Sequence, residues 1–147
     1  SGTAITQGER MKTSIATVCL AGTLEEKLQA SARAGFAGFE IFEPDLVVSP
    51  SSPAEIKARA GRLDLTLDLY QLFRDLEGVT EELFQANLHR LEAKFVLMQE
   101  LGMDMILVPS NVATATIDDD AVVAEQLHRA AELAARYDMR IAYEALA

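Results

Sequence analysis

The segment Ala34-Gly35-Phe36-Ala37-Gly38-Phe39-Glu40-Ile41-Phe42-Glu43 decides the fold, because it joins the end of a helix to a strand within a few residues. Upstream of it, Thr23 and Glu26 have the spacing of a capping box, which predicts a helix that ends at Gly35. Downstream, residues 38–42 are short and mostly apolar, as is typical of a strand. The segment therefore indicates an α/β protein.

The same alternation continues along the rest of the chain, with four helices expected between five strands. Strict alternation with short connections predicts parallel strands and right-handed crossovers, as in a doubly wound open sheet or a (β/α)8 TIM barrel. The expected strands are residues 14–20, 38–42, 65–70, 104–108 and 140–144. The expected helices are residues 23–34, 52–63, 80–102 and 118–137.

Two observations favour the barrel over the open sheet. No glycine-rich phosphate-binding motif follows the first strand, so a nucleotide site of the usual kind is not supported. Glu40 and Asp68 fall inside strands, and strand alternation points each away from its apolar neighbours, which suits a polar barrel lumen.

Since a complete barrel needs at least ~200 residues, we expect residues 11–147 to be its N-terminal half, from the first strand to the fifth. Residues 1–10 are expected to be a tag or a disordered extension.

Composition excludes several classes of partner. The chain has 23 acidic and 13 basic residues and a formal charge of −10, which would repel nucleic acid and anionic membrane surfaces. Its single cysteine, Cys19, cannot form an internal disulfide, so we expect a cytoplasmic protein, with Cys19 as a small buried side chain. No segment is long and apolar enough to predict a membrane span.

Four stretches carry a resemblance to a known family: residues 14–18 (SIATV), 34–43, 71–78 (QLFRDLEG) and 141–147 (IAYEALA). They resemble the xylose isomerase-like TIM barrels, a superfamily of sugar phosphate isomerases and epimerases. Within it, the narrower F-R-D-x-E-G and S-N-V patterns are most similar to the bacterial 3-dehydroshikimate dehydratases, which are often fused to a dioxygenase-like domain.

The resemblance implies a divalent metal, Mg²⁺, Mn²⁺ or similar, at the mouth formed by the carboxyl ends of the strands. The first ligand of such a site lies at the end of strand five, and the matching residue is Glu144. Carboxylate oxygens suit hard cations, and barrel active sites form at that end of the strands. The alternative is that Glu144 pairs with a neighbouring basic group. The catalytic base and the other ligands are expected on later strands, so this chain alone should be inactive.

The resemblance also favours substrate contacts after the strand ends. Arg74 follows the third strand, where its guanidinium could hold a carboxylate through two parallel hydrogen bonds. The alternative is a salt bridge in the loop with Asp75 or Glu77. Three further residues just past strand ends could donate hydrogen bonds to substrate hydroxyls: Gln71, Ser110 and Asn111. For Ser110 and Asn111, the preference of serine and asparagine for turns is an equally good explanation.

Other polar residues are better explained by structure. Glu43 and Asp45 are expected in a solvated loop after the second strand. Residues 118–120 are three aspartates that suit a helix start, and they lack the glycine and distal glutamate of a calcium loop. His89 and His128 fall inside expected helices, which makes neither of them a good catalytic base.

Three functions remain open. The closest resemblance implies loss of water from 3-dehydroshikimate to give protocatechuate, with a base removing the proton beside the ketone. The second is isomerisation or epimerisation of a sugar phosphate or hydroxy acid, which also uses a small polar substrate. The third is an inactive half-barrel that acts in assembly or binding. Strands one and five would have bare edges, so we expect a homo-oligomer.

Overall fold

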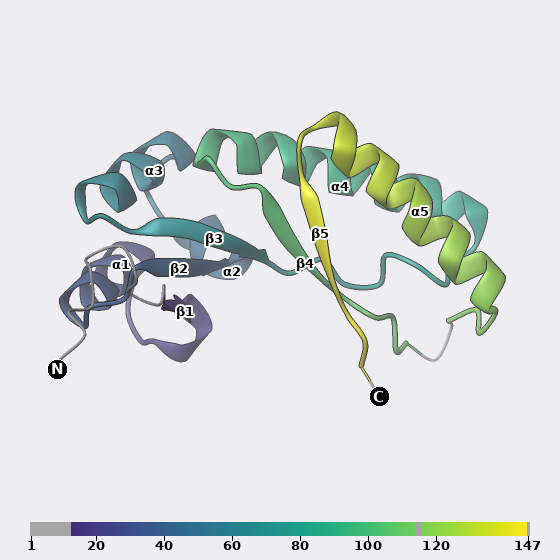
Figure 1. Ribbon diagram of the computed structural model, residues 1–147, viewed down its shortest axis with the longest axis horizontal. Coiled ribbons are helices and arrows are strands. Elements are labelled where there is room, and N and C mark those ends of the chain that lie inside the picture. Colours follow the sequence, from purple (N-terminus) through teal and green to yellow (C-terminus); the bar gives the residue numbers. More distant parts are fainter. Residues whose placement is uncertain (1–12, 114–115, 147) are drawn as a thin grey trace, which may run out of the picture.

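The computed structural model describes residues 13–113 and 116–146, and the expected N-terminal tag lies outside these ranges. Five parallel strands form one sheet in the order β1-β2-β3-β4-β5 (Figure 1). The strands are β1 (Ser14–Ala16), β2 (Gly38–Phe42), β3 (Thr66–Gln71), β4 (Met105–Pro109) and β5 (Arg140–Glu144). The helices are η1 (Thr17–Cys19), α1 (Leu24–Arg33), α2 (Glu43–Val48), α3 (Pro53–Arg62), α4 (Glu81–Leu101) and α5 (Asp120–Arg136).

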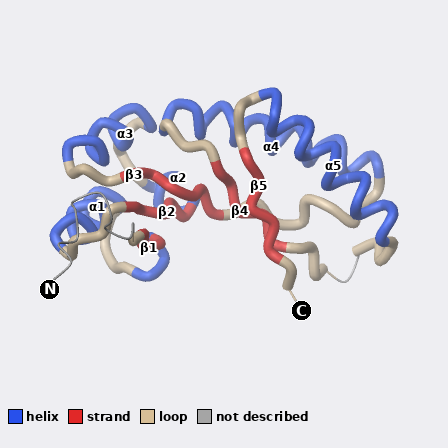
Figure 2. The backbone as a smooth tube through the Cα atoms, in the orientation of Figure 1, coloured by secondary structure: helices blue, strands red, loops and turns tan. Residues whose placement is uncertain are grey.

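The strand order is that of a barrel. Each strand pairs with its neighbour in the sequence, whereas the order reverses in a doubly wound sheet. Figure 2 shows the sheet bent into an arc with α3, α4 and α5 along its outer side. The prediction of a partial (β/α)8 TIM barrel is thus confirmed.

Three hydroxyl side chains begin the helices at the positions that the sequence predicts. Each is an N-cap whose oxygen accepts a hydrogen bond from a backbone N–H in the first turn, a group that otherwise lacks a partner. The pairs are Thr23 with Glu26 (3.2 Å), Ser52 with Glu55 (3.2 Å) and Thr80 with Leu83 (3.3 Å). Gly102, with a φ of 69°, ends α4 in the left-handed conformation that glycine adopts most easily.

The two faces of the sheet differ in polarity. Phe39 and Ile41 of β2 are fully buried against the helices, while Glu40 between them points to the opposite face and is partly exposed. A β-bulge in the pairing of β2 with β3 brings Asp68 close to Gly38, where any Cβ would collide with the aspartate carboxylate. Burial and the negative charge of Asp68 raise the pKa of Glu40. The predicted polar inner face is confirmed for Glu40.

The structure differs from the prediction where β1 and β2 end. The first strand stops at Ala16 because η1 follows, and the Thr17 hydroxyl accepts a hydrogen bond from the backbone N–H of Phe42 (2.9 Å). The turn leaves Cys19 exposed, so its predicted burial is wrong.

No described helix has the length and apolarity that a membrane crossing requires.

The expected solvated loop after β2 is also wrong, because α2 forms there. Pro44 in the first turn fixes a backbone angle compatible with a helix, and Glu43 and Asp45 lie at its positive end. Asp45 forms a salt bridge of 3.0 Å with Lys27 of α1, whose side chain is only 7% exposed. Asp45 therefore joins α2 to α1, and Glu43 likewise joins α2 to α4 through Lys94 (2.8 Å).

Candidate functional site

Glu144 is the last residue of β5 and lies at the edge where the carboxyl ends of all five strands gather. On this strand it shares a face with Ala142, opposite Ile141, which packs against the core. The Glu144 side chain is exposed, and none of the ion pairs among the described residues includes it. Its carboxylate is therefore available on the inner side of the sheet.

A single carboxylate fits a hard divalent cation as one donor of several. Within residues 13–113 and 116–146, no group of three or more histidine, cysteine, aspartate or glutamate side chains is arranged to hold a metal. Glu144 thus has the right donor chemistry and the right place, but further ligands would have to come from elsewhere. Its role as a metal ligand stays a prediction.

Ser110 holds the end of β5 in place. Its backbone N–H donates a hydrogen bond to the carbonyl oxygen of Glu144 (2.7 Å), and its Oγ accepts one from the backbone N–H of Leu146 (2.7 Å). Contact of Ser110 with a substrate remains a prediction, whereas its contact with the backbone around Glu144 is observed.

The side chain of Asn111 is used within its own surroundings. The Nδ2 atom donates to the backbone carbonyl of Glu77 (2.8 Å), and Oδ1 accepts from the backbone N–H of Ala113 (3.0 Å). These bonds account for the acceptor and one donor hydrogen of the amide. The structure therefore shows Asn111 joining two loops, and its predicted donation to substrate is not tested.

Glu77 was expected from the sequence only as a possible salt-bridge partner of Arg74, and it has a larger role in this region. It is only 2% exposed, and its Oε1 accepts hydrogen bonds from the backbone N–H of Asn111 and from the hydroxyl of Tyr143 (3.4 Å). Its Oε2 is buried without a hydrogen-bond partner among the described residues. Burial and the charge of Glu77 raise the pKa of Tyr143. Instead of pairing with Arg74, Glu77 links the loops after β3 and β4 to the residue that precedes Glu144.

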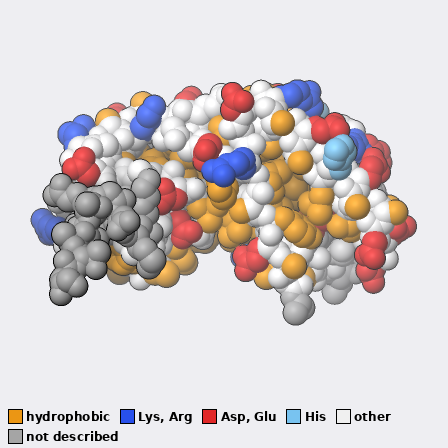
Figure 3. All heavy atoms as spheres, in the orientation of Figure 1, with side chains coloured by type: hydrophobic (Ala, Val, Ile, Leu, Met, Phe, Trp, Pro, Cys, Tyr) orange, Lys and Arg blue, Asp and Glu red, His pale blue; other side chains and the backbone are white. Residues whose placement is uncertain are grey.

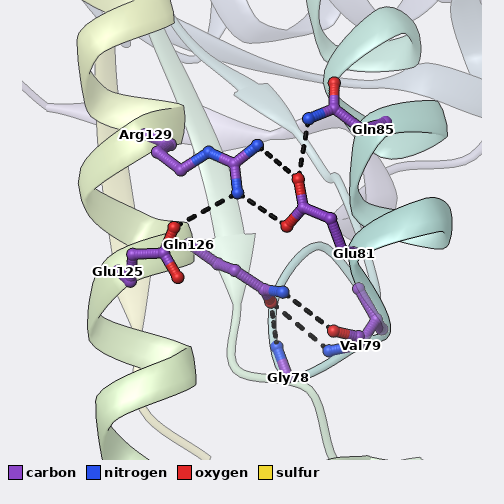
Figure 4. Close-up of polar contacts among 7 residues, drawn as sticks. All are labelled: Gly78, Val79, Glu81, Gln85, Glu125, Gln126 and Arg129. Atoms are coloured by element: carbon purple, nitrogen blue, oxygen red, sulfur yellow. Dashed lines mark hydrogen bonds and ion pairs between the residues drawn. The ribbon is translucent and has the colours of Figure 1, made fainter.

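The loop between β3 and α4 is attached to α5 by Gln126 (Figure 4). The buried Gln126 side chain accepts from the backbone N–H groups of Gly78 (2.9 Å) and Val79 (3.3 Å) and donates to the carbonyl of Val79 (2.8 Å). Beside it, Arg129 and Glu81 form a two-pronged ion pair with distances of 2.7 and 2.8 Å. This loop carries both Arg74 and Glu77, so its anchoring fixes two candidate site residues.

Arg74 lines a pocket of about 270 Å³ between the start of α2 and the loop after β3. The residues around it are Phe42, Glu43, Pro44, Leu72, Arg74 and Arg90. Glu43 is held by Lys94 of α4 (2.8 Å) and by the hydroxyl of the buried Tyr70 (2.7 Å). Burial and the Glu43 carboxylate raise the pKa of Tyr70. Gln71, the half-buried last residue of β3, pairs in register with Phe42, beside this pocket.

Known proteins share this architecture. A 3-dehydroshikimate dehydratase of Pseudomonas aeruginosa is 51% identical over 137 residues, which is 93% of this chain and 22% of the relative. The solved structure of a xylose isomerase-like TIM barrel/4-hydroxyphenylpyruvate dioxygenase fusion protein matches with a TM-score of 0.91 and 47% identity, over 93% of this chain and 22% of that one. The chain thus spans about a fifth of the length of these relatives.

A more distant structure and a family model complete the comparison. The IOLI protein with a bound zinc atom has a TM-score of 0.80 at 13% identity, over 92% of this chain and 52% of that one, a likeness of fold alone. The model of the xylose isomerase-like TIM barrels matches residues 28–147. The resemblance found in the sequence is confirmed, and this chain belongs to the xylose isomerase-like TIM barrel family.

Proposed function

We propose that this chain is the N-terminal half of the barrel of a metal-dependent 3-dehydroshikimate dehydratase, an enzyme that removes water from 3-dehydroshikimate to give protocatechuate. The observation that carries the proposal is the 51% identity to a dehydratase over 93% of the chain. The position of Glu144 on the inner side of the sheet, at the carboxyl end of β5, is compatible with it. In this proposal residues 11–147 form one half of the barrel. The protein is proposed to be cytoplasmic because its single cysteine cannot form an internal disulfide.

The proposed roles follow from side-chain chemistry. Glu144 is one ligand of a divalent cation, which when bound would stabilise negative charge that develops on a ketone oxygen. Arg74 binds the substrate carboxylate through its guanidinium group. Three neutral residues, Gln71, Ser110 and Asn111, are proposed to face substrate hydroxyls. The zinc atom in the structurally similar IOLI protein supports a metal in this fold, without identifying the metal here.

The test is a titration of Mn²⁺ into the chain and into a version extended to a complete barrel, with protocatechuate formation followed by its ultraviolet absorbance. We expect tight binding and turnover only in the extended protein, because one carboxylate does not hold a hard cation by itself. Glu144→Ala should abolish both, while Glu100→Ala, an exposed glutamate on α4, should leave both unchanged.

Two other results would change the assignment. Metal binding that depends on Glu144, without release of water from 3-dehydroshikimate, would favour an isomerase or epimerase of the same family. Absence of metal binding in both proteins would overturn the metal-dependent reaction and leave the barrel as a scaffold for assembly or binding.

A further inference from the structure

Two arginines from different elements line the pocket between the start of α2 and the loop after β3. Arg74 comes from the loop after β3, and Arg90 comes from the third turn of α4. Only Arg74 is recognisable from the sequence, because Arg90 lies in the middle of a long helix and away from any strand end. The pocket therefore has a second cationic side chain that the proposed function does not use.

The guanidinium group of Arg90 is held in a fixed orientation. Its Cζ lies 4.8 Å from the centroid of the buried Phe73 ring, within the range of a cation–π contact. Its Nη1 donates to Oδ1 of Asn87 (3.2 Å). The Nδ2 atom of Asn87 donates to the carbonyls of Asp75 and Leu76 (2.9 and 3.1 Å), so only Oδ1 is left to face the arginine. One guanidinium hydrogen is used, and the others remain available.

The negative charge in the pocket is already neutralised. Glu43 accepts hydrogen bonds from Lys94 (2.8 Å) and Tyr70 (2.7 Å), which occupy both of its carboxylate oxygens. Among the residues that the structure describes, the ion pairs within 4.0 Å include neither Arg74 nor Arg90. Two arginines without an acidic partner at one concave site, in a chain with a net charge of −10, form a local attraction for anions.

We infer that this pocket binds the carboxylate of a small organic acid, with Arg74 and Arg90 as its two cationic arms. A guanidinium group matches the planar geometry of a carboxylate with two parallel N–H donors. The volume of about 270 Å³ suits a compact molecule, and Phe42, Pro44 and Leu72 give the pocket apolar walls that favour a carbon skeleton over inorganic phosphate. The inference rests on the proposed function only for the identity of the acid, which would then be 3-dehydroshikimate.

The test uses the 147-residue chain labelled with ¹⁵N-arginine, in which the Nε–Hε signals of single arginines are followed by NMR. Three probes are added in turn: protocatechuate, its neutral analogue 3,4-dihydroxybenzamide, and inorganic phosphate. We expect protocatechuate to shift the signals of Arg74 and Arg90 together. The amide should have no effect on either, and phosphate should bind more weakly than protocatechuate because it gains nothing from the apolar walls.

Substitutions at Arg90 distinguish the contribution of oriented guanidinium hydrogen bonds to carboxylate binding from that of positive charge alone. Arg90→Gln should weaken protocatechuate binding by about ten- to a hundredfold, the range expected for loss of hydrogen bonds to a charged group. Arg90→Lys keeps the charge but not the planar donors, so it should weaken binding by about tenfold. Arg62→Gln, which removes an exposed arginine in the last turn of α3, is the matched control and should change nothing.

The outcomes distinguish this inference from the dehydratase proposal. Equal responses to protocatechuate and the amide, tighter binding of phosphate, or equal effects of Arg62→Gln and Arg90→Gln would each overturn the pocket assignment. In the extended protein, Arg90→Gln should raise KM with little change in kcat. If the Arg90→Gln variant turns over with an unchanged KM, the pocket inference is wrong and the dehydratase proposal stands. If carboxylate binding depends on the arginines but the extended protein shows no turnover, the dehydratase proposal is wrong and the pocket inference stands.

Discussion

Glu77 and Asn111 are joined by two hydrogen bonds that run in the same direction, both donated by the asparagine. The backbone N–H of Asn111 binds Oε1 of Glu77, and the Asn111 side chain binds the glutamate's backbone carbonyl at 2.8 Å. Since Tyr143 also contacts Glu77 at 3.4 Å, three neighbouring strand ends meet at one buried carboxylate. Shortening this side chain should therefore affect all three.

Glu77→Ala should lower the free energy of unfolding by about 1–3 kcal/mol, because the partly buried N–H of Asn111 would lose its acceptor. Urea denaturation followed by circular dichroism measures the change. Glu100→Ala, which removes an exposed carboxylate from α4, should stay within about 0.5 kcal/mol of the parent chain. Similar stabilities for the two variants would show that the contacts of Glu77 contribute nothing.

Gln126→Ala should loosen the loop between β3 and α4 without unfolding the sheet. Its side chain makes three hydrogen bonds to Gly78 and Val79, and their backbone groups would lose them. We expect faster amide hydrogen exchange in residues 72–80 and a stability loss of about 1–3 kcal/mol. Gln99→Ala, at an exposed position of α4, serves as the control. Unchanged exchange in the loop would contradict the anchoring role.

Glu40→Gln should stabilise the chain at neutral pH. Burial and Asp68 raise the pKa of Glu40 in the folded chain, so the folded state favours the protonated carboxyl that glutamine imitates. In the parent chain this contribution is fully present below the unfolded pKa of about 4.3 and is lost as the pH rises through the folded pKa. The difference in melting temperature between variant and parent should thus be largest near pH 7 and vanish near pH 3. A difference independent of pH would exclude titration of Glu40 as its cause.

The isolated chain should self-associate. In the described sheet, β1 and β5 each pair on one side only, which leaves backbone groups unpaired along two edges. Figure 3 shows hydrophobic side chains gathered in the middle of the viewed face, and Tyr143 and Leu146 near the β5 edge are 41% and 42% exposed. Sedimentation velocity at micromolar concentration should detect a dimer or larger species.

A charge placed on the edge tests the cause of this association. Ala142→Lys on β5 should shift the population towards monomer, while Ala131→Lys on the exposed face of α5 adds the same charge and should not. A monodisperse monomer of the parent chain would contradict the prediction of a homo-oligomer.

The fold could be predicted largely because its signals are local. Capping residues such as Thr23 and Ser52, and glycines such as Gly102, mark helix ends through contacts with residues a few positions away. The short helix α2 was missed because it has only 6 residues and follows the strand directly. The exposure of Cys19 was missed because the first strand was expected to reach Leu20, whereas it ends at Ala16 and Cys19 lies in the turn η1.

The site was predictable only where family motifs cover it. Glu144, Arg74, Gln71, Ser110 and Asn111 come from segments beside strand ends, and the structure places them at that edge of the sheet. Glu77 and Arg90 were missed as site residues because their partners, Asn111 and Phe73, lie 34 and 17 positions away. Such pairings depend on how the loops fold over each other, which composition and periodicity do not encode.

The strand order also bears on how the chain acquires its structure during synthesis. Within the described sheet each new βα unit pairs with the unit made just before it, so each of the strands β2 to β5 finds one neighbour already synthesised. Short separations in sequence also lower the entropy lost when each contact closes. The sheet can therefore grow one unit at a time from the amino end, with the α4 and α5 layer added as soon as the strand it covers has emerged.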